Sequence, residues 1–421
     1  MVTSMTRRTR LGLLLAALGV FAVAAVAVPR SAAPLPAGAL PCTTGPTFNL
    51  QARTGRISTP DGASMFMWGF AKNPGAFQMP GPILCVTEDV PITINLTNSN
   101  IPEPVSIVFP GQTGVVAAGG SPGLFTQEVA MGGGTVSYTF TPSEPGTYLY
   151  ESGSDLSKQI QMGLYGALIV RPAGFPSRAY ADVSTAFDPA REYLILVHDM
   201  DPDLHRAVER NEPYDVTQKH DRYWTINGRS FPDTIAGDGV AYLPAQPYGA
   251  LVRVKPYNAT TNPLPALIRM ANAGMSNHPL HPHGNHVQVI AQDGQLVGPG
   301  TSRSSEQFTR TAASGQTFDM LFKWTNAENW TSTHPVPVTL PLLRNLVFKD
   351  KVTWYSGSPY LGTKSTLPPG TVSFNRCGEY YYPWHSHALN EFQNFDEGFG
   401  GLATLLRVDP PNKTALQCPG P

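Results

Sequence analysis

The sequence has few charged residues, and their two signs nearly cancel. Asp, Glu, Lys and Arg make up 14% of the 421 residues, and the formal net charge is −1. Proteins that bind nucleic acids or anionic membrane surfaces carry a basic excess, so neither partner is expected. Glycine and proline are abundant instead, with 40 and 41 residues. This composition favours many short strands joined by turns over long helices.

A long apolar run occurs only near the N-terminus. It covers residues 11–28 and follows the basic residues Arg7, Arg8 and Arg10. A basic start, an apolar stretch and small residues after it are typical of an export signal, so we interpret residues 1–39 as a signal peptide and leader. An uncleaved anchor is the alternative, because the run just reaches membrane-spanning length. With no second run, the mature chain is expected to have no membrane span and to be periplasmic or secreted.

The first half of the chain shows a repeated strand pattern. Segments such as 92–96, 105–109 and 136–140 place β-branched or aromatic residues at alternate positions. Glycine-rich turns such as 132–134 separate them. The pattern predicts an antiparallel β-sandwich over residues 40–172.

A second sandwich is predicted over residues 191–408, after a linker at 173–190. It is longer than one such domain requires. The excess lies at about 301–369, is rich in Ser, Thr, Pro and aromatic residues, and is interpreted as an insertion. Residues 409–421 are expected to form an irregular tail. The predicted fold class is therefore all-β, with two antiparallel β-sandwich domains.

Cysteine is scarce. The four residues are Cys42, Cys85, Cys377 and Cys418, and an exported protein would hold them oxidised. Four cysteines allow three pairings, of which we predict Cys42 with Cys85 and Cys377 with Cys418, one bond per domain. None stands beside a histidine motif, so all four are interpreted as structural.

Histidines gather in two short segments. Six of the ten lie there, namely His278, His281, His283, His286, His385 and His387. Two prolines in the first segment exclude a helix, so the segment is extended and leads into an apolar strand. Alternate residues of an extended chain share a face, so each segment presents a His-x-His pair on one side. Four such imidazoles suit copper or zinc. The alternative is that the histidines cap backbone groups. It is plausible for a single histidine, but it does not explain why six gather in two segments.

The other histidines are less informative. His198 belongs to the run His198-Asp199-Met200-Asp201, which has metal-ligand residue types but is interpreted as a surface turn at a strand end. His205, His220 and His334 are interpreted as residues of polar loops.

The histidine segments resemble signatures of the multicopper oxidases. His278-Pro279-Leu280-His281-Pro282-His283-Gly284 is similar to that family's His-Pro-x-His-x-His-Gly, and His385-Ser386-His387 stands where the family has His-Cys-His. Other family landmarks occur in order: Pro80-Gly81-Pro82-Ile83-Leu84, Pro145-Gly146-Thr147-Tyr148-Leu149-Tyr150, Gly163-Leu164-Tyr165-Gly166-Ala167-Leu168-Ile169-Val170 and Ile226-Asn227-Gly228-Arg229. The resemblance spans almost the whole mature chain and implies a laccase-like arrangement of two cupredoxin domains, each a Greek-key sandwich.

The sequence departs from the family at the type 1 copper site. In the family, this site passes electrons to a trinuclear copper cluster and needs a cysteine thiolate and two histidines. Ser386 stands at the cysteine position and Glu391 at the second histidine position, so His278 alone remains of that set. A hydroxyl group does not replace the thiolate, and we predict that no blue copper forms.

Half of the family's trinuclear ligands are also missing. Val108-Phe109-Pro110-Gly111 stands in place of a His-x-His-Gly segment, and Glu151-Ser152-Gly153 in place of the second first-domain pair. The other half is intact. By resemblance, His281 matches a type 2 copper ligand, and the remaining three match type 3 ligands: His283, His385 and His387.

The four retained histidines are expected to hold one type 2-like copper ion, or two if Glu151, Glu391 or a neighbouring subunit adds ligands. Zinc is the alternative metal, because neutral imidazoles accept it as well. Two-domain relatives assemble as trimers around the cluster, so a homotrimer is an expectation, although identical subunits would bring no further histidines. His286 is out of phase with the alternation and is predicted to make a supporting hydrogen bond.

Three functions remain open. The first is an exported copper-dependent oxidoreductase, in which a small-molecule reductant meets the copper directly and Glu391 acts as a catalytic acid or base. The second is a copper-binding protein that sequesters or delivers the metal ion through the same histidines. The third is a catalytically silent cupredoxin scaffold, which predicts no tight metal. The retention of four clustered histidines favours the first two.

Overall fold

The structure is a computed structural model of the chain. It describes residues 40–284, 286–297, 306–325, 380–398 and 400–409, together with four short strands between positions 336 and 375. Strands dominate the described residues, which confirms the predicted all-β fold class. Among the helices in these ranges, none has the length and apolar character needed to cross a membrane.

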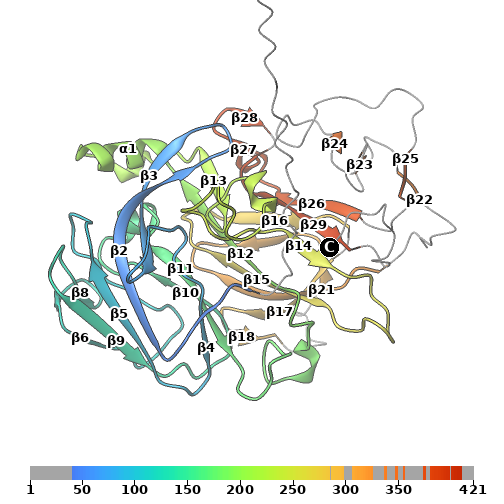
Figure 1. The fold of residues 1–421 in the computed structure, drawn as a ribbon, viewed down its shortest axis with the longest axis horizontal. Helices are drawn as coiled ribbons and strands as arrows, with labels where there is room; N and C mark the ends of the chain where they lie inside the picture. Colours follow the sequence, from blue (N-terminus) through green and yellow to red (C-terminus); the bar gives the residue numbers. More distant parts are fainter. Residues whose placement is uncertain are drawn as a thin grey trace, which may run out of the picture. The chain divides into compact units, whose positions relative to one another are not determined.

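The first half of the chain forms two sheets (Figure 1). Burial alternates along the central strand of one of them, where Ile92, Ile94 and Leu96 face the core, as a half-buried strand requires. This five-stranded sheet has the order β3 (Ser64–Lys72), β2 (Thr47–Ser58), β5 (Ile92–Asn98), β9 (Thr135–Phe140) and β6 (Val116–Ala118). The four-stranded sheet has the order β1 (Thr43–Thr44), β4 (Leu84–Thr87), β11 (Tyr165–Arg171) and β10 (Gly146–Glu151), and β7 (Ser121–Pro122) pairs with β8 (Gln127–Glu128).

The second half forms two further sheets, and no sheet of the described residues mixes strands from both halves. The larger has the order β13 (Tyr223–Ile226), β12 (Glu192–Met200), β15 (Ala266–Asn272), β21 (Thr317–Phe322), β17 (Val287–Gln292) and β18 (Gln295–Leu296), with β19 (Glu306–Gln307) also on β17. The smaller has the order β14 (Val252–Val254), β29 (Ala403–Val408), β26 (Tyr380–Ser386), β16 (His278–Pro282) and β20 (Arg310–Ala312). A hairpin of β27 (Gln393–Asn394) and β28 (Glu397–Gly398) comes after β26 in the chain.

The two predicted connecting regions differ in how much of them the structure describes. In the linker at 173–190, Phe187 is fully buried and packs against Leu267 and Leu321 of the second half. The predicted insertion lies mostly outside the described residues. Between positions 336 and 375, the structure describes the main chain of β22 (Val336–Val338), β23 (Val347–Phe348), β24 (Trp354–Tyr355) and β25 (Ser373–Asn375).

An apolar interface joins the two halves. Leu149 of β10 and Ile169 of β11 pack in one cluster with Leu194 and Leu196 of β12. These four side chains are at most 3% exposed, so their burial stabilises the two halves together, by about 2 kcal/mol for each side chain fully removed from water.

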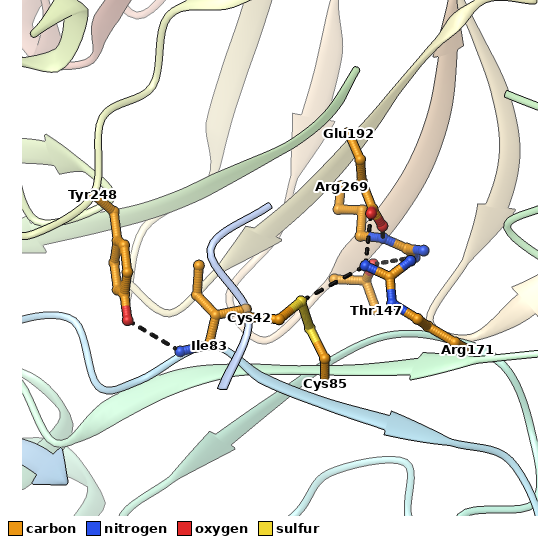
Figure 2. The surroundings of a disulfide bond; sticks show 8 residues. All are labelled: Cys42, Ile83, Cys85, Thr147, Arg171, Glu192, Tyr248 and Arg269. Atoms are coloured by element: carbon orange, nitrogen blue, oxygen red, sulfur yellow. Dashed lines mark hydrogen bonds and ion pairs between the residues drawn. A yellow bond between two sulfur atoms is a disulfide. The ribbon is translucent and has the colours of Figure 1, made fainter. Parts of the chain in front are cut away.

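A buried charge network lies at this interface (Figure 2). Arg269 Nε lies 2.6 Å from Glu192 Oε1, and Arg269 Nη1 lies 3.2 Å from both Asp319 Oδ1 and Thr147 Oγ1. Arg171 Nη2 lies 2.6 Å from the second oxygen of Glu192. Thr147 and Arg171 belong to the first half and the other three residues to the second, so the network connects the halves by charge.

The helix α1 (Pro202–Arg210) was not predicted from the sequence. Asp201 caps it by accepting a hydrogen bond from the Asp203 N–H at 2.9 Å, and Pro202 occupies its first turn. Leu204 of α1 is buried in the core of the first half. His205 is also buried in this helix, so its interpretation as a loop residue was wrong.

The predicted disulfide between Cys42 and Cys85 is confirmed (Figure 2). It joins the residue before β1 to Cys85 of β4, the parallel neighbour of β1, where Thr43 pairs with Leu84. The other predicted pair, Cys377 and Cys418, lies outside the described residues.

Candidate metal centre

The two histidine segments form neighbouring antiparallel strands. On β16 and β26, His281 lies opposite His385. Beyond the strand ends the pairing continues, because the N–H of His283 donates to the Pro383 carbonyl at 2.9 Å and that of His387 donates to the Pro279 carbonyl at 2.7 Å. The alternation predicted from the sequence therefore brings both His-x-His pairs to the same face of one sheet.

The four rings on this face lie close together. The ring centroids are separated by 4.7 Å for His281–His283, 5.2 Å for His281–His387, 5.3 Å for His283–His385, 5.7 Å for His281–His385 and 5.8 Å for His385–His387. Nε2 of His283 lies 3.2 Å from Nε2 of His385. Two nitrogens on one tetrahedral ion, each at about 2.0–2.1 Å from it, are about 3.3 Å apart. This pair therefore has the spacing of two ligands of a single metal ion.

Two of the rings are oriented through their other nitrogen. His281 Nδ1 contacts the Phe308 carbonyl and lies 2.9 Å from Thr309 Oγ1, and His385 Nδ1 lies 2.7 Å from the Ser386 carbonyl. A carbonyl only accepts, so each Nδ1 carries the proton and each Nε2 keeps its lone pair. Metal-ligating histidines are commonly held in this way.

Burial favours the neutral, ligating form of these rings. Together with the neighbouring histidines, it lowers the pKa of His283 to about 4, and it lowers the pKa of His281 and His385 as well. His387 is exposed, so one side of the cluster is open to solvent. Within the described residues, no group of three or more His, Cys, Asp or Glu side chains is arranged to hold a metal ion as it stands. Closing all four rings on one ion therefore requires side-chain rotation.

A different set of residues occupies the opposite face of β16 and β26. Glu391 Oε2 accepts a hydrogen bond from Ser386 Oγ at 2.5 Å and lies 3.0 Å from His278 Nδ1. On the other side of the ring, His278 Nε2 lies 3.5 Å from Asp199 Oδ2, and Lys219 Nζ lies 3.5 Å from Asp199 Oδ1. His278 is thus enclosed between two carboxylates.

These carboxylates determine the charge of His278. Burial alone lowers the pKa of its imidazole, but the contacts with Asp199 and Glu391 outweigh burial and raise the pKa to about 9. An imidazolium has no lone pair for a metal. At neutral pH His278 is therefore an imidazolium between Asp199 and Glu391, and Ser386 donates a hydrogen bond to Glu391. Ser386, Glu391 and His278 are the three residues that the resemblance assigned to type 1 ligand positions.

The structure separates the residues that the sequence analysis grouped. His281, His283, His385 and His387 come together, whereas His278 and Glu391 lie on the other face, and no contact in the described residues joins either to the four rings. Glu391 is therefore not positioned as an acid or base beside the cluster. The exposed ring of His286 packs edge-on against Phe308.

The structure also places the 198–201 segment and Glu151, which were further candidates for metal ligands. His198, Asp199, Met200 and Asp201 are fully buried at the end of β12, so the surface-turn interpretation was wrong. Asp199 was missed as the partner of His278, because the two are far apart in sequence and share no local pattern. Glu151 pairs through its backbone with Val108 in the first half, and burial raises the pKa of its carboxyl to about 7.

Comparisons with known proteins agree with this fold. Residues 59–174 match a family model described as multicopper oxidase. The Blue Copper Oxidase from Nitrosomonas europaea has a similar structure, with a TM-score of 0.56 and 19% identity over 86% of this chain and 85% of that chain. The Multicopper Oxidase mgLAC has a TM-score of 0.57 and 17% identity over 88% and 89%. The Cu-containing nitrite reductase (NirK) from Thermus scotoductus SA-01 has a TM-score of 0.50 and 16% identity over 89% and 63%.

No curated protein sequence matches the chain. At identities below 20%, the structural similarities establish the fold, a pair of cupredoxin-like β-sandwiches. The family-model match adds a sequence relationship in the first half of the chain. The chain therefore has the fold of the multicopper oxidases to which it was compared, and over residues 59–174 it is also similar to them in sequence.

Proposed function

We propose that this protein is an exported copper-binding oxidoreductase with one histidine-ligated copper and no type 1 copper. The ligands are His281, His283, His385 and His387. The observation that supports the proposal is the approach of these four rings on one face of β16 and β26, with ring centroids 4.7–5.8 Å apart. Neutral imidazoles suit copper, and the family relationship favours copper over zinc.

The surrounding residues support direct access to this site. The Phe308 carbonyl and Thr309 hold His281 on one side, while the exposed His387 leaves the other side open. Bound copper would supply one-electron redox chemistry. Because the type 1 positions hold an ion pair, we propose that a small-molecule reductant reaches the four-histidine site itself. Storage or delivery of copper is the second candidate, because it needs the same ligands. A measurement of oxygen consumption distinguishes it from the oxidoreductase.

Metal content is the first test. Wild-type protein loaded with copper should retain about one copper per chain with a type 2 EPR spectrum and no intense blue colour, because four imidazoles and no thiolate surround the ion. His281→Ala/His387→Ala should retain none. His220→Ala, which removes an exposed histidine elsewhere, should behave as wild type.

Four other results of the copper-loading experiment would contradict parts of the proposal. Absence of stoichiometric copper from the wild type would contradict the proposed site and favour a silent scaffold, and selective zinc retention would contradict the choice of metal. An intense blue protein would contradict the loss of type 1 copper. Copper retention without oxygen consumption in the presence of small-molecule reductants would leave storage or delivery as the function.

Copper affinity should also decrease as pH falls, because the proposed ligands are imidazole rings. Protons compete with the metal, so affinity falls as pH falls. Because the pKa of His283 is lowered from 6.5 to about 4, and that of His281 and His385 is lowered too, the steepest loss should occur below about pH 6. Competition titrations against a chelator of known affinity measure this between pH 8 and pH 4. Affinity that stays constant over that range would exclude imidazole ligands.

A further inference from the structure

The two strands that carry the proposed copper ligands also contact each other through side chains on the face turned away from the four rings. On β16, His278 and Leu280 are buried on this face, and Leu280 pairs with Ser386 of β26. Ser386 is fully buried and lies between His385 and His387 in the chain. Any group that holds Ser386 therefore also holds the backbone that carries two of the four proposed ligands.

Glu391 connects Ser386 to His278. Its Oε2 accepts a hydrogen bond from Ser386 Oγ at 2.5 Å and lies 3.0 Å from His278 Nδ1. His278 belongs to β16 and Ser386 to β26, so one carboxylate oxygen bridges the two strands. We call His278, Glu391 and Ser386 the clamp. The clamp crosses the strand pair on one face, and the two His-x-His pairs project from the other.

The clamp is anchored to the larger sheet through His278. The Nε2 atom of this ring lies 3.5 Å from Oδ2 of the buried Asp199 on β12. The Asp199 carboxylate also accepts hydrogen bonds from the backbone N–H groups of Met275 and Ser276, at 2.8–3.1 Å. Because several donors fix this carboxylate, His278 has a fixed support on the side away from Glu391.

The turn after β26 brings Glu391 to its place in the clamp. The Ala388 N–H donates to Ser386 Oγ at 3.2 Å, and the Glu391 N–H donates to the Ala388 carbonyl at 2.9 Å. The next residue, Phe392, packs against the ring of His385, with 4.9 Å between the ring centroids. The turn therefore holds the ligand segment at two points, the Ser386 side chain and the His385 ring.

The spacing of the two strands decides whether the four rings can share one ion. His283 Nε2 and His385 Nε2 lie 3.2 Å apart, and the other rings reach the same ion by side-chain rotation. Rotation completes the site only if the two backbones stay in place, because the ligands of a functional site are held within about 0.5 Å of their productive positions. A bridge between β16 and β26 supplies this constraint without occupying the face on which the metal binds.

We propose that the clamp sets the spacing of the four proposed copper ligands from the opposite face of the sheet. His278, Glu391 and Ser386 are then positioning residues for the metal, which they do not touch. The inference rests on the proposed copper site and extends it. The residues at the former type 1 positions support the remaining site instead of forming a second one.

Copper affinity of three variants tests the clamp. Ser386→Ala cuts it at β26, Glu391→Ala removes the bridging oxygen, and neither removes a proposed ligand. Each should weaken copper binding by about 10–100-fold, as loss of a group that orients a metal ligand commonly does, and should change the copper hyperfine splitting in the EPR spectrum. Glu391→Gln keeps an acceptor oxygen for Ser386 Oγ and should stay within about threefold of the wild type.

A measurement without metal distinguishes failure of the clamp from failure of the copper site. In the wild type, the Ser386 carbonyl holds the proton of His385 on Nδ1. Long-range ¹H–¹⁵N NMR spectra of the metal-free chain at pH 8 should show this single tautomer for His385, and a mixture of both tautomers in Ser386→Ala and Glu391→Ala. If the wild type bound no copper, the copper site would be refuted, and these spectra would still decide whether the clamp orients His385.

The matched control is Asp396→Ala. It removes a carboxylate from the same segment, but one that is 78% exposed and pairs with Arg222. Copper affinity and the His385 tautomer should remain as in the wild type. Circular dichroism verifies that each variant is folded, and if Glu391→Ala does not fold, Ser386→Ala decides alone, because it leaves the contact between Glu391 and His278 intact.

Three results would overturn the inference. The first is wild-type copper affinity and a wild-type His385 tautomer in Ser386→Ala and Glu391→Ala. The second is a loss in Glu391→Gln as large as that in Glu391→Ala, which would indicate an effect of charge and not of position. The third is an equal loss in Asp396→Ala.

Discussion

Arg269→Ala is expected to destabilise the folded chain by about 3–5 kcal/mol, because removal of one partner from a buried ion pair leaves uncompensated charge. Arg269 is fully buried, and the side chains of its partners Glu192 and Asp319 are 4% and 1% exposed. Arg171 still neutralises Glu192 in the variant, but within the part of the chain that the structure describes Asp319 keeps only neutral partners, the hydroxyls of Thr147 and Tyr180. Equilibrium unfolding in urea, followed by tryptophan fluorescence, measures the loss.

The chain provides a matched control for this substitution. Arg56 pairs with Glu209 on the surface, where the two side chains are 48% and 37% exposed. Exposed pairs contribute about 0–1 kcal/mol, so Arg56→Ala should have little effect. If both alanine variants lose equally little stability, the buried network does not hold the two halves together.

The stability of the wild type should fall as pH rises from about 6.5 to 9 because of His278. Its pKa is raised from 6.5 to about 9 in the folded state. Below pH 6.5 the imidazole is protonated in both states, and its contribution is complete. Above pH 6.5 the unfolded chain loses the proton first, and the contribution disappears as pH passes through the folded pKa. The difference between the folded and unfolded pKa values corresponds to about 3 kcal/mol of folding stability.

The variant His278→Leu isolates this effect. It should unfold at lower urea concentration than the wild type at pH 6.5, and the difference between the two proteins should shrink as pH approaches 9. Glu151, whose pKa is raised to about 7, adds a loss of stability in the same direction but at lower pH, and it does so in both proteins. A difference between wild type and variant that is constant over this range would show that His278 is not held as an imidazolium.

The sequence could predict the features that depend on local periodicity. The alternation of residues on an extended chain was sufficient to place His281, His283, His385 and His387 on one face, once the two segments paired. Strands β5 and β9 of the first half followed from the same period of two, whereas the predicted strand at 105–109 was wrong, because Val105 and Val108 form only isolated bridges. The disulfide between Cys42 and Cys85 was predicted by choosing among the three ways in which four cysteines can pair.

The features that it could not predict depend on contacts between distant segments. Asp199 belongs to a strand of the larger sheet, and nothing near it in the sequence indicates that it faces His278 of the smaller one. The whole of β12 is buried on both faces, so its polar residues carry no alternation that would mark the buried side. For α1, the Asp-Pro-Asp start was a helix signal that the sequence analysis overlooked.

The position of Leu204 limits where this chain can be divided into separate domains. Leu204 completes the core of the first half, although it comes from the chain after β12. Residues 40–172, the predicted first domain, would lack this side chain and would also leave Leu149 and Ile169 uncovered. The match to the family model ends at residue 174, so a boundary of sequence similarity falls between segments that pack in one core. A chain cut at that boundary would expose Leu149 and Ile169 to water and would favour aggregation of the first half.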